Sequence, residues 1–294
     1  DSASTNSIVS ENSILTVNPA PTATSLTPSN TILDLGQYET YNVIISGGSS
    51  PFTVNLIYVN GPDTVNGIVA GNVIETLTSQ SDGTVTFPSF NSFSTNGIYT
   101  FNVVATDSAS TPVTFNSISS TITVDPALSV SISPTSNTLD ANQQLPLQTT
   151  VSGGTPSFSL TYSLSNYLCG SISASSNTLS GDGSNTIIFM PNSAITSTCT
   201  ANIMVSVTDS ASTNSIVSEN SILTVNPAPT ATSLTPSNTI LDLGQYETYN
   251  VIISGGSSPF TVNLIYVNGP DTVNGIVAGN VIETLTSQSD GTVT

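Results

Sequence analysis

The stretch Thr40–Gly61, TYNVIISGGSSPFTVNLIYVNG, decides the fold class of this chain of 294 residues. Apolar side chains alternate with polar or outward-facing ones from Tyr41 to Ile45 and again from Phe52 to Tyr58. A period of two residues is typical of a half-buried β-strand. The Gly-Gly-Ser-Ser-Pro run between them has the composition of a turn. We therefore expect two β-strands connected by a turn.

The same pattern returns elsewhere in the chain. Val151–Tyr162, VSGGTPSFSLTY, is a diverged copy, and all of Asp1–Thr86 is repeated letter for letter as Asp209–Thr294, an interval of 208 residues. A shorter echo, TDSAST, begins at Thr106 and again at Thr208, an interval of 102 residues. A long identical repeat built from two half-length relatives predicts a tandem array of small domains.

Further β-prone segments complete the first repeat. Short strands are expected around Ile68–Ala70, Val73–Leu77 and Thr84–Phe87, and longer ones at Tyr99–Ala105 and Ile118–Val124. Short strands between turn residues, with no helical periodicity and about 100 residues per unit, favour a Greek-key β-sandwich. The predicted fold class is all-β: tandem sandwiches arranged as beads on a stiff string.

Proline-containing joints divide this array. We expect residues 1–18 to be the last strand or strands of a preceding domain, 21–124 a first domain type, 127–225 a second type, and 228–294 an incomplete first type that repeats 20–86 and lacks its last two strands. The joints Asn18–Pro21 and Asp125–Pro126 are short, and proline stiffens them, so neighbouring domains should keep a defined orientation. Asp1 lies inside a repeat, which indicates a window on a longer protein.

Several of these motifs carry a resemblance. The openings around Pro28 and Pro134, the stretches Ile45–Gly61 and Val151–Tyr162, and the closing Val207–Thr213 resemble tandem immunoglobulin-like or PKD-like repeats of giant archaeal and bacterial surface proteins. This resemblance implies Ig-like sandwiches in stalks, adhesins, surface-layer parts or extracellular filaments. Family members commonly place an aromatic such as Trp in the third strand, and this chain has none. Four other aromatics are expected to fill that core: Phe52, Tyr58, Phe158 and Tyr162.

The charge balance is one-sided. The chain has 18 acidic residues and no Lys, Arg or His, for a net charge of −18. Nucleic-acid binding needs cationic side chains opposite phosphates, so that class is excluded, as is electrostatic attraction to anionic lipid. One interpretation of this composition is drift in a low-charge surface protein. The other is adaptation to acid, because a chain without basic groups approaches zero net charge near pH ~2–3 instead of becoming cationic.

The two cysteines, Cys169 and Cys199, fall in the same domain. An even count in a Ser/Thr-rich, Lys-free chain indicates an oxidising, extracellular setting. Two buried thiols are the alternative, but a disulfide is favoured. Cys199 begins a late strand on its inward face, where the first domain type has Gly97. The bridge would add about 3–4 kcal/mol in the chain-entropy model.

Catalytic and metal-binding patterns are weak. Without His or Lys the usual general bases and amine nucleophiles are missing, and the acidic residues are scattered singly, so we predict no enzyme and no cofactor. Calcium is the ion most commonly bound by extracellular β-arrays, and its site needs several carboxylates close to one another. Asp107, Asp125 and Asp209 are candidates, yet none has an acidic neighbour in sequence, and a turn or cap role is favoured. No apolar run is long enough to span a membrane.

These features favour a structural role outside the cell, on the cell surface or in a secreted filament. The leading prediction is a fibre or stalk of covalently linked Ig-like domains whose partners are neighbouring domains and other copies of the chain. One alternative is the passive stalk of an adhesin whose tip, and any cell-surface or carbohydrate ligand, lies elsewhere. A second is a pilus-like subunit with donor-strand exchange.

Overall fold

The computed structural model describes residues 12–90 and 93–294, and every regular element in those residues is a β-strand. The predicted all-β class is confirmed. Among the described segments no helix could span a membrane. Contacts divide the chain into one unit of Asp1–Ala127 with Ala211–Thr213 and another of Leu128–Ser210 with Asn214–Thr294.

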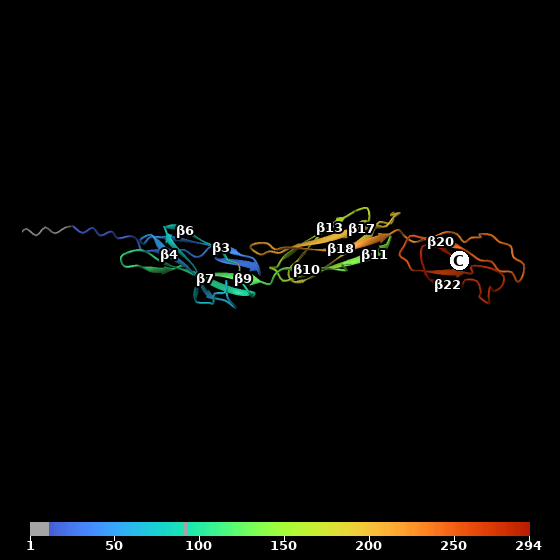
Figure 1. Cartoon of the computed structure of the whole chain (residues 1–294), viewed down its shortest axis with the longest axis horizontal. Helices are drawn as coiled ribbons and strands as arrows, with labels where there is room; N and C mark the ends of the chain where they lie inside the picture. The colour runs from blue at the N-terminus through green and yellow to red at the C-terminus, as the bar shows by residue number, and fades with distance from the viewer. Residues whose placement is uncertain (1–11, 91–92) are drawn as a thin grey trace, which may run out of the picture. The chain divides into compact units, whose positions relative to one another are not determined.

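The first sandwich consists of two facing sheets in the first unit (Figure 1). One sheet has the order β1-β3-β6, with β1 (Thr22–Ala23), β3 (Glu39–Ser46) and β6 (Gly83–Phe90). The other has the order β2-β9-β7-β4-β5, with β2 (Asn30–Asp34), β9 (Ser120–Asp125), β7 (Gly97–Thr106), β4 (Phe52–Asn60) and β5 (Asn72–Gln80), and β8 (Thr114–Asn116) pairs with β7. In the second sheet β2 lies beside β9 and β4 beside β7 although other strands separate each pair in the sequence, as a Greek-key connection requires.

The alternation seen in the sequence places side chains in the core between these sheets. Tyr41, Val43 and Ile45 of β3 are buried, as are Phe52 and its successors at every second position of β4. The four aromatics expected to replace the missing Trp are all buried: Phe52, Tyr58, Phe158 and Tyr162.

One predicted strand is wrong. Residues Ile68–Ala70 form a turn region in which Ile68 makes an isolated bridge with Val65. Gly67 and Gly71 both have positive φ values, 75° and 87°, so the backbone turns on each side of this segment and cannot extend as a strand.

A parallel pairing also went unpredicted. β2 lies parallel to β9, with Leu33 opposite Val124. The two strands are about ninety residues apart, and local alternation carries no information on such a partner.

The second sandwich repeats this plan in the second unit. One sheet has the order β10-β12-β16-β14, with β10 (Ser129–Ser133), β12 (Leu145–Ser152), β16 (Gly183–Pro191) and β14 (Gly170–Ile172). The other has the order β11-β18-β17-β13-β15, with β11 (Ser136–Asp140), β18 (Ile216–Asn226), β17 (Cys199–Thr208), β13 (Phe158–Ser165) and β15 (Ser176–Leu179).

The third sandwich has fewer strands. β19 (Thr230–Ala231), β20 (Val251–Ser254) and β23 (Gly291–Val293) form one sheet, and β21 (Phe260–Ile265) pairs with β22 (Val281–Gln288) in the other. Residues 1–11 of the segment expected to end a preceding domain lie outside the described residues. Residues 12–18 form no strand, although the identical residues 220–226 belong to β18, where β17 and β11 pair with them.

Candidate functional site

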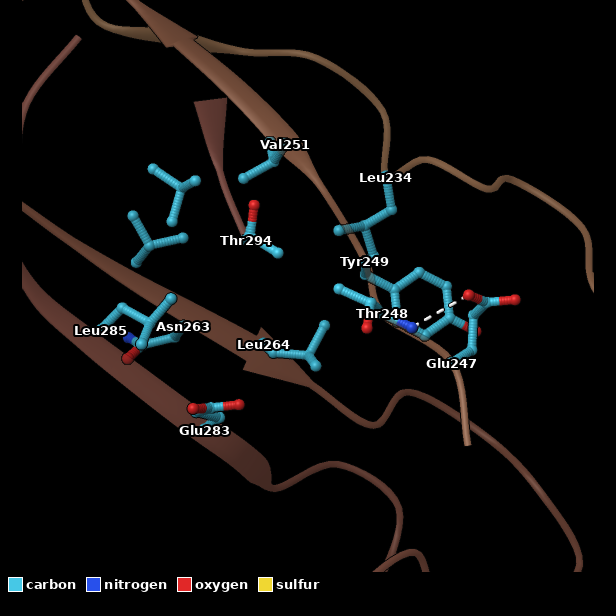
Figure 2. Close-up of a pocket in the computed structure, with 12 residues that line it drawn as sticks. Leu234, Glu247, Thr248, Tyr249, Val251, Asn263, Leu264, Glu283, Leu285 and Thr294 are labelled. Carbon is cyan, nitrogen blue, oxygen red and sulfur yellow. Dashed lines mark hydrogen bonds between the residues drawn. The ribbon is translucent and has the colours of Figure 1, made fainter. Parts of the chain in front are cut away.

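A cleft of about 320 Å³ lies between the two sheets of the third sandwich. Figure 2 shows Leu234 and Val251 on one side of it and Leu264 and Leu285 on the other. Most lining side chains are apolar or aromatic, and none is cationic. The lining residues are Leu234, Glu247, Thr248, Tyr249, Val251, Val262, Asn263, Leu264, Glu283, Leu285, Val293 and Thr294.

Each lining residue has an identical counterpart 208 positions earlier in the first sandwich. There the apolar and aromatic counterparts other than Leu77 are buried in a closed core: Leu26, Tyr41, Val43, Val54, Leu56 and Val85. Leu26 has no exposed surface, whereas Leu234 is 40% exposed; Leu33 is likewise fully covered, whereas Leu241 is 44% exposed. Because the two sequences are identical, the difference comes from what covers them.

The cover in the first sandwich is β7 and β9. β7 lies between β4 and β9, and β9 lies between β7 and β2. In the third sandwich β21, the counterpart of β4, pairs only with β22 within the described residues. Residues 238–242, identical to β2, form no strand. One edge of β21 therefore has no strand partner among the described residues.

The rest of the third sandwich keeps the hydrogen bonds of the first. The Thr284 hydroxyl donates to Asn263 Oδ1 at 2.8 Å, as Thr76 donates to Asn55 at 2.7 Å. The Tyr266 hydroxyl donates to the Asp271 carbonyl at 2.7 Å, repeating a Tyr58 bond. These strands and turns of the third sandwich thus keep the local structure that they have in the first.

Two carboxylates border the cleft, Glu247 and Glu283. Glu247 Oε1 accepts the backbone N–H of Thr248 at 3.0 Å, the dashed line of Figure 2. In the closed first sandwich burial raises the pKa of Glu75, the counterpart of Glu283. Burial, and then the nearby Glu39, raises the pKa of Tyr41, the counterpart of Tyr249.

The two predicted disulfide residues meet in the second sandwich. Cys169 and Cys199 are joined with an S–S distance of 2.11 Å. Cys199 opens β17 opposite Val225 of β18, and Cys169 is fully buried beyond the end of β13. The bridge ties a loop to the last strands of the core.

The predicted calcium candidates lie apart and bind backbone groups. Asp107 accepts the N–H of Val113 at 2.8 Å and that of Ser49 at 3.2 Å, and these bonds, the Val113 bond first, lower its pKa. Asp209 accepts the N–H of Ser215 at 2.8 Å in the equivalent turn. Both carboxylates organise turns, as the sequence favoured. Nowhere in residues 12–90 and 93–294 do three His, Cys, Asp or Glu side chains gather in a metal-binding group.

Asp125 lies at the end of β9, opposite Asp34 of β2. Its carbonyl accepts the N–H of Leu35 at 2.9 Å. This aspartate thus fixes the strand end that precedes the Asp125–Pro126 joint.

The same side-chain hydrogen bond occurs at two joints, where the asparagine before the joint proline contacts the Gly-Gly turn of the next sandwich. Asn18 Nδ2 donates to Ser49 Oγ at 2.9 Å. The identical pair Asn226 and Ser257 has a distance of 3.0 Å, and Ser257 Oγ donates to Asp140 Oδ1 at 2.6 Å. At the joint in the second unit, two hydrogen bonds therefore link the side chains of three residues, Asn226, Ser257 and Asp140.

Backbone contact accompanies this chain. The N–H of Gly256 donates to the Pro227 carbonyl at 2.7 Å. A Cβ at Gly255, which has a φ of 72°, would lie 2.8 Å from the Ala228 carbonyl oxygen. Glycine is needed here because the turn approaches the joint too closely for any side chain.

Comparisons with known proteins find distant structural similarity. No protein-family model and no curated protein sequence matches the chain. Among solved structures, fibronectin(III)-like modules of Clostridium thermocellum CbhA are 10% identical, with 68% of this chain and 92% of that chain covered and a TM-score of 0.31. The ICAM-5 D1–D4 ectodomain fragment is 14% identical, with 90% of this chain and 67% of that chain covered and a TM-score of 0.31. Mouse cadherin-23 EC22–24 is 14% identical, with 70% of this chain and 67% of that chain covered and a TM-score of 0.35.

The sequence predicted the joints but neither the cleft nor the hydrogen bonds at the joints. It predicted that residues 228–294 lack two strands, and the open core is a direct consequence that could have been found by aligning the two copies. No sequence pattern predicts the hydrogen bonds that link Asn226, Ser257 and Asp140, because they depend on which turn lies against which strand end in the fold.

Proposed function

We propose that this chain is a structural extracellular protein in which covalently linked Ig-like sandwiches form a fibre or a cell-surface stalk. The recurrence of the same joint contacts carries the proposal. Asn18 with Ser49 and Asn226 with Ser257 place a side-chain hydrogen bond at the same point of the repeat. An array whose joints combine short Pro-containing linkers with a hydrogen bond that recurs at two of them suits a load-bearing or spacing role.

The chemistry of the surface supports the same role. The Asp107 and Asp209 carboxylates accept backbone N–H groups of turns, and the chain offers no His or Lys for acid–base or nucleophilic catalysis. The disulfide of the second sandwich suits an oxidising compartment outside the cell. Partners are accordingly other copies of the chain, whose repeated identical surfaces favour lateral association into bundles.

Electron microscopy of the native material at its source pH tests this function. Long filaments with a regular repeat near two domain lengths are expected for a fibre. Isolated strings that end in a distinct knob would instead assign the array to the passive stalk of an adhesin. Compact single particles would contradict both forms of the proposal.

A further inference from the structure

We infer that one sheet face of the second sandwich is a self-association surface, which packs against the same face of a second copy of this chain. The face is the outer side of the sheet β11-β18-β17-β13-β15, and β11, β13, β17 and β18 are labelled in Figure 1. It consists of the side chains that point away from the core, at every second position of these strands. The inference rests on the lateral association included in the proposed function and names the surface that makes it.

Hydroxyl and amide side chains form rows across this outer face. Thr161 of β13 lies opposite Ser206 of β17, and Ser206 lies opposite Ser218 of β18, with the two serine hydroxyl oxygens 2.8 Å apart. Serine, threonine and asparagine side chains each donate and accept hydrogen bonds, so a face built from them is complementary to a copy of itself. Two further rows of this kind follow along the strands: Ser163 with Met204 and Asn220, and Ser165 with Asn202 and Ile222.

Carboxylates are kept off this face. Of the residues in these five strands only Asp140 and Glu219 are acidic. Glu219 lies opposite the buried Val205, so it belongs to the other side of β18. Asp140 ends β11 at the joint, where its Oδ1 accepts the Ser257 hydroxyl. Two copies that each have a net charge of −18 repel each other, so a contact between them is favoured where no carboxylates meet, and this face meets that condition.

Two exposed apolar side chains lie within the face. Met204 is 39% exposed and Ile222 is 53% exposed. Met204 lies opposite Asn220 and Ile222 lies opposite Asn202, so the two apolar residues are diagonal neighbours on adjacent strands, within reach of each other's long side chains. A second face that covers them would remove both from water. An apolar centre with a polar surround is the usual arrangement of a protein–protein interface.

The size of the face fits a reversible contact. A strand spacing of about 4.8 Å and a rise of about 3.3 Å per residue give roughly 500–600 Å² for a sheet of five strands that average about seven residues. Two such faces would bury about 1,000–1,200 Å² in total, which is at the lower end of the range for specific interfaces. We therefore expect dimers that form and dissociate readily in solution.

Sedimentation equilibrium of the full chain and of two matched variants tests the inference. The unsubstituted chain is expected to dimerise reversibly at ~10–100 μM. Thr161→Asp is expected to weaken dimerisation at least ~10-fold, because each copy then brings a carboxylate into the interface. Thr150→Asp is the control and should change it less than ~3-fold, since Thr150 is equally exposed on a central strand, β12, but belongs to the opposite sheet.

A second pair of variants adds no charge. Met204→Ser should weaken dimerisation about 5-fold, because it removes apolar surface from the interface. Its control is Ile188→Ser, since Ile188 is 38% exposed on β16 of the opposite sheet and its replacement should have little effect. Far-UV circular dichroism checks the folding of all four variants. The Met204 and Ile188 pair decides the outcome if Thr161→Asp unfolds its sandwich.

A chain that stays monomeric up to ~1 mM would overturn the inference, as would an equal loss of dimerisation in the variants of both sheets. Electron microscopy separates these results from a failure of the proposed function. Single filaments or strings formed by a chain that does not dimerise would leave the fibre or stalk in place and remove only this surface. Compact single particles would contradict the proposed function, and the four variants would still decide whether this face is a contact between copies.

Discussion

Leu56 of β4 is fully buried, whereas Leu264, the same residue of the same sequence 208 positions later, is only half-buried. Phe101 and Val103 belong to the strand beside Leu56, and no described strand takes that place beside Leu264. The chain thus contains an internal control in which one set of residues is present in a closed and an open form.

This pair predicts unequal costs for one substitution. Leu56→Ala should destabilise the first sandwich by about 2–5 kcal/mol, because it leaves a cavity in a closed core. Leu264→Ala should cost its sandwich less than about 1 kcal/mol, since solvent already reaches the site. Hydrogen exchange of peptides from residues 97–125, a sequence that occurs once in the chain, measures the stability of the first sandwich. Leu264→Ala changes the mass of its own peptide, so that peptide can be told apart from the identical one of the first sandwich and its exchange measures the stability of the third. Equal losses of protection would contradict the open form.

The disulfide should stabilise the second sandwich selectively. The bridge spans a sequence separation of 30 residues, so removing it with the double substitution Cys169→Ala and Cys199→Ala should cost about 3 kcal/mol. Peptides from β13 and β17 should lose protection from hydrogen exchange, and peptides from residues 97–125 should not. Intact mass after alkylation without reductant should show no label. Two labels would contradict the bridge.

The strands were largely predictable and the sites were not. Alternation at Tyr41–Ile45, Phe52–Tyr58 and Tyr99–Ala105 correctly gave β3, β4 and β7, because each buries one face and period-two burial is local information. The parallel contact of β2 with β9 was missed because pairing between distant strands is not local. Ser257 looked like an ordinary turn residue, and only the fold shows that it joins Asn226 to Asp140.

Asp107 predicts a pH-dependent contribution to the first sandwich. Its pKa is lowered, chiefly by the Val113 N–H, so its stabilising effect is present above the unfolded-state pKa of about 3.9 and is lost as the pH falls through the folded-state value. Asp107→Asn should therefore destabilise the first sandwich at pH 7 and match the unsubstituted chain at pH ~1–2. Exposed Asp82→Asn is the control. Hydrogen exchange of residues 97–125 at each pH measures the difference in stability between Asp107→Asn and the unsubstituted chain. A difference that stays constant with pH would contradict this role of Asp107.

Loss of these carboxylate contacts does not predict acid unfolding of the whole chain. Ordinary proteins unfold in acid partly because Lys, Arg and His remain positive and repel one another once carboxylates are neutral. Here 18 acidic side chains lose their charge on acidification and no basic side chain remains, so self-repulsion falls instead of rising. The β-sheet circular dichroism should therefore persist at pH ~2.

A charge-altered variant separates this cause from intrinsic stability of the sandwiches. Lysines introduced at exposed positions such as Ser131, Thr161 and Ser163 leave the core unchanged but stay positive in acid. The variant should fold like the parent at pH 7, where added cations offset the net charge of −18, and should unfold at a higher pH than the parent on acidification. If both proteins lose their β-sheet signal at the same acidic pH, the missing basic residues are not what protects the fold.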